Sequence, residues 1–208
     1  GVSDNTCGVP IAVGKTTYER LNIYNSNISL GLLYGKTTCY IPDAILVNAK
    51  PIIPFWHNRT TYPQTQYVSA NYADSRNVST KSFEFLNSNK DNSFYFVMYY
   101  GAPDGAGHAF GENSLQYNDS LVNVDQALGM LLDYLSSNSI NAQIILSADH
   151  GWNEGTTGHG TNAYDTVTIP LFSNNASLVN KIYAHGLRRQ CDIAPTILKI
   201  FKIKQPSH

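Results

Sequence analysis

The chain has 208 residues, of which 42% are hydrophobic and 14% are charged, and its net charge is −1. This length predicts a single domain, residues 1–208, with one substantial core. The weak charge argues against a nucleic-acid polymer as a partner, and no apolar run reaches the roughly 18 residues that a membrane span needs.

The first third of the chain predicts few regular elements. A short helix is expected over 16–21 and a strand over 28–34. The segment 40–72 contains four prolines and an aromatic group around Trp56. This composition predicts an irregular, Pro- and aromatic-rich segment that passes over the domain. A helix is then expected around 80–87.

The middle of the chain predicts a strand, a long helix and a second strand. The near-continuous apolar run at 94–100 is typical of a central strand that is covered on both faces. Ser114 is placed to cap the helix, and the short apolar run at 144–146 predicts the next strand, which completes a βαβ unit. The predicted apolar stripe of the helix consists of Leu121, Val124, Leu128, Leu131 and Leu135.

Two more elements are predicted after these. A strand is expected over 166–172, near a sheet edge, because Pro170 has no backbone N–H to donate. Asp192 is placed to cap a last helix over 193–201. Alternating strands and helices predict an α/β fold with a mainly parallel central sheet flanked by helices.

Two polar clusters directly follow the strands predicted at 94–100 and 144–146. Each cluster offers one carboxylate and one imidazole, and a further imidazole follows after a Gly-rich turn. The carboxyl ends of strands carry the chemistry of α/β proteins, and these side chains are ligands that zinc accepts. The candidate metal ligands are Asp104, His108, Asp149, His150 and His159.

The motifs that contain these residues resemble a known superfamily. They are D-x-x-G-H-x-x-G at 104–111, S-A-D-H-G at 147–151, G-H at 158–159 and D-I-A-P-T at 192–196. Together they resemble the alkaline phosphatase superfamily, and within it the type I phosphodiesterases and nucleotide pyrophosphatases. The similarity implies an alkaline-phosphatase-like fold and a small phosphate ester or nucleotide as substrate.

The resemblance also implies two divalent metal ions, with zinc as the expected metal. By match of motif, Asp104, His108 and His159 would hold one ion, while Asp149 and His150 would hold the other. Two cations about 4 Å apart can stabilise both the attacking and the leaving oxygen of a displacement at phosphorus.

In the superfamily, a Thr or Ser nucleophile precedes the part that this chain resembles, and no residue here has an obvious claim to that role. We therefore expect the nucleophile upstream of Gly1, and the chain to be the C-terminal part of a catalytic domain. The 208 residues alone are expected to be inactive. A missing N-terminal segment or another chain is expected to complete the fold.

The expected function is a metal-dependent hydrolase of phosphate esters, of phosphodiesterase, nucleotide pyrophosphatase or phosphatase type. Two alternatives stay open. One is a non-catalytic surface or structural protein that keeps the fold. The other is a sulfatase or a phosphoethanolamine transferase of the same superfamily, although the Cys-x-Pro-x-Arg motif of sulfatases does not occur in the sequence.

Five asparagines lie in Asn-X-Ser/Thr sequons, which are glycosylation acceptors in secreted proteins. They predict a glycoprotein that is extracellular or at the cell surface. The candidates are Asn27, Asn58, Asn77, Asn118 and Asn175.

Overall fold

The computed structural model describes residues 17–34, 45–47, 50–52, 65–69, 74–178 and 189–203. The aromatic group around Trp56 and the sequon at Asn58 lie outside these ranges. Within the Pro-rich segment 40–72, the described residues form three short strands that the proline content did not predict. These strands are β2 (Ile45–Val47), β3 (Lys50–Ile52) and β4 (Thr65–Ser69).

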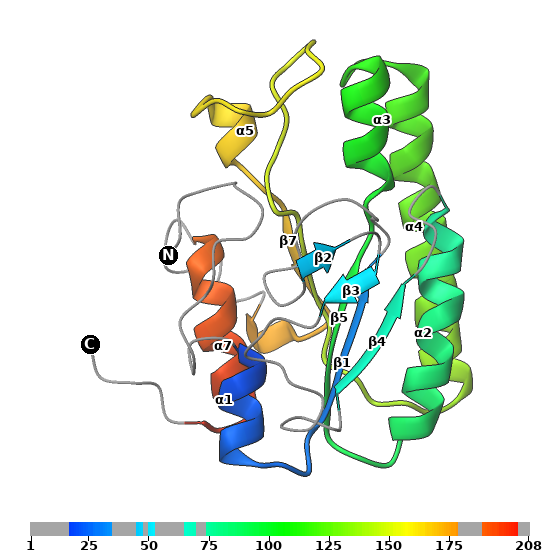
Figure 1. Ribbon diagram of the computed structural model, residues 1–208, viewed down its shortest axis with the longest axis vertical. Helices are drawn as coiled ribbons and strands as arrows, with labels where there is room; N and C mark the ends of the chain where they lie inside the picture. Colours follow the sequence, from blue (N-terminus) through cyan, green and yellow to red (C-terminus); the bar gives the residue numbers. More distant parts are fainter. Residues whose placement is uncertain are drawn as a thin grey trace.

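A parallel three-stranded sheet lies at the centre of the fold (Figure 1). Strand β1 (Ser29–Tyr34) pairs with β4 on one side and with β5 (Phe94–Tyr99) on the other, both in parallel. These two strands confirm the predictions over 28–34 and 94–100. Strand β1 is the central one, and its residues Leu30, Leu32 and Leu33 are buried.

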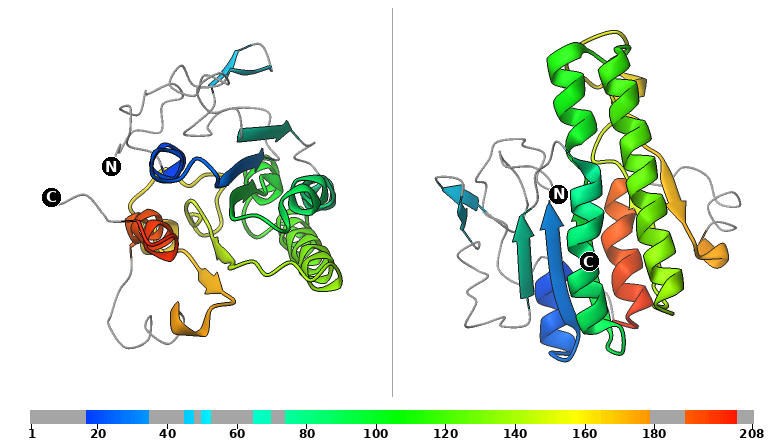
Figure 2. Two further views of the ribbon diagram at one scale, coloured as in Figure 1. Left: turned by 90° about the horizontal axis from the view of Figure 1, so that it is seen from below. Right: turned by 90° about the vertical axis from the view of Figure 1, so that its right-hand side faces the viewer.

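Helices cover both faces of this sheet, as Figure 2 shows. On one face, α1 (Thr17–Tyr24) and α7 (Ile193–Ile200) pack on β1 and β5 through a shared apolar cluster. The buried members of this cluster are Tyr18, Leu21, Ile28, Leu30, Leu32 and Leu198. The predicted parallel sheet with flanking helices is therefore present.

On the other face, α2 (Ser75–Asn89) lies against β1 and β5. A Cβ at Gly31 would lie 2.6 Å from the ring of Phe85 and 2.7 Å from the ring of Phe96. Glycine thus lets these two rings, stacked with centroids 4.4 Å apart, pack directly on the backbone of β1. Helix α2 is longer than the helix predicted around 80–87.

Helix α4 (Leu115–Ser137) packs against α2 and begins where the sequence predicted. The Ser114 hydroxyl accepts a hydrogen bond from the Tyr117 N–H at 3.1 Å. Leu131 and Leu135 are buried, but Leu121, at the other end of the predicted stripe, is 45% exposed. The described part of the chain contains no helix whose length and apolarity would suit a membrane span.

The predicted strand over 166–172 is wrong for most of its length. Residues 164–167 instead form the short helix α5 (Tyr164–Val167), and the described strand here is β7 (Leu171–Ser173), which begins only after Pro170. Thr166 explains the difference, because its carbonyl accepts the Gly151 N–H at 2.7 Å and its hydroxyl donates to Asn153. These contacts hold the backbone around Thr166 in a helical turn, so it does not pair as a β-strand.

Strand β6 (Ile145–Ser147) pairs with β7 in an antiparallel arrangement. The elements of the expected βαβ unit follow in order, but within the described ranges β6 does not pair with β5. Every residue of β5 is only half-buried, although helices lie on both of its faces. This residual exposure agrees with the outer edge of β5 having no partner strand in the part of the chain that the structure describes.

Candidate metal centre

Two candidate ligands lie on one short helix that follows β5. Helix α3 (Ala102–Phe110) starts after Gly101 and has Pro103 in its first turn, where proline is tolerated. Asp104 and His108 are four residues apart and therefore share a helix face. His108 Nε2 lies 3.4 Å from Asp104 Oδ1. The expectation that this pair sits directly at a strand end is corrected, because both residues are helical.

The other three candidates come from the irregular chain after β6. His159 Nε2 lies 3.4 Å from Asp104 Oδ1 and 3.1 Å from His108 Nε2. His150 Nε2 lies 4.0 Å from the same Asp104 oxygen and 3.7 Å from Asp149 Oδ2. The tertiary structure thus brings together all five residues that the sequence singled out.

Three of the ligand atoms have the spacing of a zinc site. The separations among Asp104 Oδ1, His108 Nε2 and His159 Nε2 are 3.1, 3.4 and 3.4 Å. A tetrahedral zinc ion with bonds of about 2.0–2.1 Å places its ligand atoms about 3.3 Å apart. An alternative grouping of Asp104, His150 and His159 lies within 4.8 Å. The first grouping fits one ion better because its spacing already matches.

Backbone carbonyls orient two of the imidazoles. His108 Nδ1 lies 2.9 Å from the carbonyl oxygen of Thr157, and His150 Nδ1 lies 2.9 Å from that of Gly151. A carbonyl oxygen can only accept, so Nδ1 carries a proton in each ring, and in the neutral imidazole this leaves the Nε2 lone pair free. In both rings Nε2 is the atom nearest Asp104, as metal binding requires.

Burial and neighbouring charges shift the pKa values of His159 and Tyr99. Burial, followed by the neighbouring His150, lowers the pKa of His159, which favours the neutral imidazole that binds metals. Burial also raises the pKa of Tyr99, and Asp149 and Asp104 add to that shift. The Tyr99 hydroxyl therefore stays protonated, and it donates a long 3.4 Å hydrogen bond to Asp149 Oδ2.

Sequence reasoning missed Tyr99, Trp152 and Gln190. Tyr99 is the last residue of β5, and its only signal was that it ends an apolar run just before a polar cluster. Gln190 Nε2 donates to the carbonyl oxygen of Asp149 at 2.9 Å, a contact that no local pattern could reveal. Trp152 is 7% exposed, and its signal in the sequence was a large aromatic residue directly after the Asp-His-Gly motif.

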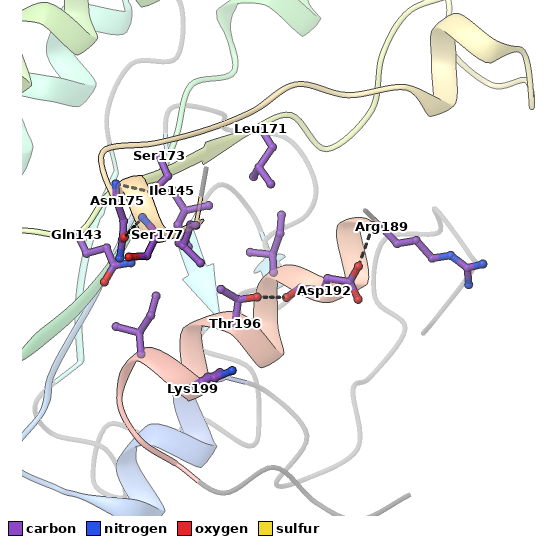
Figure 3. A pocket seen from close by; sticks show the side chains of 13 residues that line it. Gln143, Ile145, Leu171, Ser173, Asn175, Ser177, Arg189, Asp192, Thr196 and Lys199 are labelled. Atoms are coloured by element: carbon purple, nitrogen blue, oxygen red, sulfur yellow. Dashed lines mark hydrogen bonds between the residues drawn. The ribbon is translucent and has the colours of Figure 1, made fainter. Parts of the chain in front are cut away.

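A cavity of about 480 Å³ lies between α7 and the β6–β7 pair (Figure 3). Apolar side chains from both sides line it, among them Ile145, Leu171 and Ile193. The Arg189 side chain extends away from the other lining residues in Figure 3. None of the five candidate metal ligands lines this cavity, so it is separate from the candidate metal centre.

Asp192, which lines this cavity, directly precedes α7, but its side chain makes no capping hydrogen bond with the helix, so the predicted capping role is wrong. Its carboxylate accepts the Arg189 N–H at 2.9 Å instead of an N–H of the helix. The carboxylate therefore closes the preceding turn, while the Thr196 hydroxyl donates to the Asp192 carbonyl at 2.6 Å.

The described sequons differ in exposure. Asn27 and Asn118 are exposed, whereas Asn77 and Asn175 are half-buried. Glycosylation at these positions stays a prediction, and the exposed pair offers the least hindered acceptors.

The model of the type I phosphodiesterase / nucleotide pyrophosphatase family matches residues 30–175. That range contains all five clustered side chains and the strands that precede them. The chain belongs to this family. The resemblance to the alkaline phosphatase superfamily is thereby confirmed, and the family acts on phosphate esters.

Individual relatives of this phosphodiesterase-family chain carry different names. A 2,3-bisphosphoglycerate-independent phosphoglycerate mutase from Metamycoplasma hominis is 30% identical over 138 residues, which cover 65% of this chain and 26% of that protein. GPI ethanolamine phosphate transferase 2 from Schizosaccharomyces pombe is 28% identical over 160 residues, 68% of this chain and 21% of that protein. Ectonucleotide pyrophosphatase/phosphodiesterase family member 7 from Mus musculus is 35% identical over 102 residues, 47% of this chain and 21% of that protein.

The chain thus spans only about a quarter or less of the length of these relatives.

Proposed function

We propose that the complete protein is a metal-dependent hydrolase of phosphate esters, of phosphodiesterase, nucleotide pyrophosphatase or phosphatase type. The observation that carries this proposal is the convergence of two carboxylates and three imidazoles from α3 and from the chain after β6. Membership of the phosphodiesterase family supports the same chemistry. A small phosphate ester or nucleotide is the proposed substrate.

In this proposal Asp104, His108 and His159 hold one divalent ion, and Asp149 and His150 take part in holding a second, with zinc as the metal. When bound, two such ions stabilise the attacking and the leaving oxygens of a displacement at phosphorus. The chain's own contribution is orientation and charge. Two carboxylates and three neutral imidazoles leave two dications with net positive charge, which favours an anionic substrate.

We also propose that a Thr or Ser nucleophile and an additional strand come from a segment upstream of Gly1, or from another chain. Among the described residues nothing pairs with the outer edges of β5 and β6, and both strands lead to the same cluster without pairing with each other, which supports the additional strand. A strand between them would satisfy both edges. Its carboxyl or amino end would then lie near the five ligands.

The similarity to an ethanolamine phosphate transferase favours one second candidate, transfer of a phosphoethanolamine group instead of hydrolysis. The two activities differ only in the acceptor, which is water or an alcohol. A non-catalytic surface or structural protein that keeps the fold and a sulfatase of the same superfamily are the remaining alternatives. An extracellular or cell-surface location is proposed for each of these functions, on the strength of the exposed sequons at Asn27 and Asn118.

Metal content and turnover of the full-length protein test the proposed function together. Elemental mass spectrometry should find about two zinc or similar ions per chain, and the protein should hydrolyse a chromogenic phosphodiester. His108→Ala and Asp149→Ala should each lower both the metal content and the rate. Asp125→Ala is the matched control, because Asp125 is exposed on α4 and should change neither.

Full metal content and activity in His108→Ala and Asp149→Ala would contradict the assignment of these residues as metal ligands. Bound metal with no turnover of phosphodiesters or phosphomonoesters would favour the non-catalytic protein. Turnover that requires an alcohol acceptor would favour the transferase.

A further inference from the structure

We propose that Trp152 is a positioning residue for the metal centre: its buried indole is the platform against which the histidines are held. The proposal rests on the metal centre proposed above. The Trp152 ring meets the rings of His108 and His159 edge to face, each with centroids 5.0 Å apart, and lies 6.3 Å from that of His150. No other described aromatic ring has such contacts with all three imidazoles.

The indole is itself fixed by two contacts. It lies against Gly107 of α3, where a Cβ would be only 2.7 Å from Trp152 Cζ2. Its Nε1–H donates to the carbonyl oxygen of Thr156 at 2.9 Å. The ring therefore cannot shift without moving either the helix or the loop.

The same carbonyl also links the loop to the turn that follows α3. The Thr156 oxygen also accepts the Glu112 N–H at 3.0 Å, and the Glu112 carboxylate accepts the Gly155 N–H at 3.0 Å. The next carbonyl, that of Thr157, is the acceptor for His108 Nδ1. A displaced indole would thus move the carbonyl that sets the orientation of His108.

The consequence is that Trp152 joins the two parts of the site. Asp104 and His108 come from α3, whereas His150 and His159 come from the loop, and ligand spacing within a few tenths of an ångström depends on how the two parts meet. Groups that orient metal ligands typically change metal affinity about 10–100-fold when they are altered. Trp152 should act in this way without touching the metal.

Gly107→Ala tests the role by moving the indole without removing it. The new methyl group must displace the ring, so we expect zinc affinity, measured by competition with a chromophoric chelator, to fall at least about tenfold. The matched control is Gly129→Ala, also inside a helix, where no atom lies within 4 Å of the new Cβ. The control should bind zinc as the unaltered protein does.

Trp152→Phe is the second variant, because it keeps an aromatic ring and loses the Nε1–H bond to Thr156. It should also weaken zinc binding about tenfold, with a thermal midpoint of the metal-free protein that shows it is folded. A spectroscopic readout uses Trp152→Phe as its reference. The emission of Trp152, taken as the difference between the spectra of the unaltered protein and of Trp152→Phe, should change with the same midpoint as zinc binding.

Three outcomes separate the proposals. Weaker zinc binding in Gly107→Ala and Trp152→Phe, with zinc-dependent emission, supports the positioning role. Unaltered zinc affinity in both folded variants overturns the positioning role of Trp152 but does not contradict the proposed metal centre. No zinc binding by the unaltered full-length protein overturns the metal centre itself, and the positioning role with it.

Discussion

The two parts of the candidate metal centre are built in different ways. On α3, Asp104 and His108 are held four residues apart by the helix backbone alone. The loop between His150 and His159 has no regular structure, and it is held by hydrogen bonds that its side chains make with backbone groups and with other side chains. Asn153, for example, accepts hydrogen bonds from two threonine hydroxyls.

This difference indicates which part of the site is more sensitive to substitution. A helix keeps its ligand spacing through repeated backbone hydrogen bonds, so no single side chain decides it. The loop depends on a few individual contacts, such as the close packing at Gly151 and the hydrogen bonds of Asn153, and no repeated pattern replaces one that is lost. Substitutions that spare every ligand should therefore damage the loop and leave the helix intact. Four predictions test this contrast in the full-length protein.

Gly151→Ala should have the largest effect. Its Cβ would lie 1.9 Å from the Asp165 carbonyl oxygen and 3.0 Å from that of Thr168, and backbone atoms cannot yield as a flexible side chain can. We expect a loss of about 3 kcal/mol in the free energy of unfolding, measured by urea denaturation, together with loss of metal. Gly158→Ala, which meets no atom within 4 Å, is the control. Equal stabilities of the two variants would contradict the prediction.

Asn153→Ala should come next. Its side-chain oxygen accepts from the hydroxyls of Thr161 and Thr166, and Thr166 is buried, so the change leaves a buried hydroxyl without this acceptor. The expected cost in the urea experiment is about 2 kcal/mol. Thr168→Val, at an exposed position nearby, should cost much less. A neutral Asn153→Ala would show that the loop is held by other contacts.

Ser114→Ala should have a smaller effect, confined to stability. The hydroxyl caps α4 by accepting the Tyr117 N–H, and loss of such a cap costs about 1 kcal/mol. Metal content should not change, because the Ser114 hydroxyl, which also donates to the carbonyl oxygen of Gly111 at the end of α3, contacts none of the five candidate ligands. Ser114→Asp, which retains a capping side chain, should recover the thermal midpoint. A change in metal content would show that the candidate ligands depend on Ser114.

His108→Ala should have the smallest effect on the stability of the metal-free protein. The His108 side chain is 50% exposed, so its removal should change the free energy of unfolding by no more than about 0.5 kcal/mol. The same variant should lose metal, as elemental analysis would show. A large loss of metal-free stability would mean that His108 supports the fold as well as the site.

The helices and strands with strong periodic or apolar patterns were predictable from the sequence. The runs at 28–34 and 94–100 became β1 and β5, and Ser114 caps α4 as expected. The strand predicted over 166–172 failed because Thr166 is held by the Asp-His-Gly loop, which is distant in sequence. Local propensity could not include that tertiary contact.

The candidate ligands were also accessible to sequence reasoning, because Asp and His followed two apolar runs that end at one edge of the fold. The residues that hold them were not. Trp152 and Gln190 act through contacts with backbone carbonyls and with other rings, and such contacts leave no spacing pattern in the chain.

The sequence by itself thus determined which side chains are candidate metal ligands, and it placed them after strands, since ligand chemistry and strand patterns are both local properties. Only the tertiary structure decided that Asp104, His108 and His159 lie 3.1 to 3.4 Å apart. That spacing depends on how α3 packs against a loop some fifty residues away in sequence. Packing between distant segments is a property of the whole fold, so no local pattern encodes it.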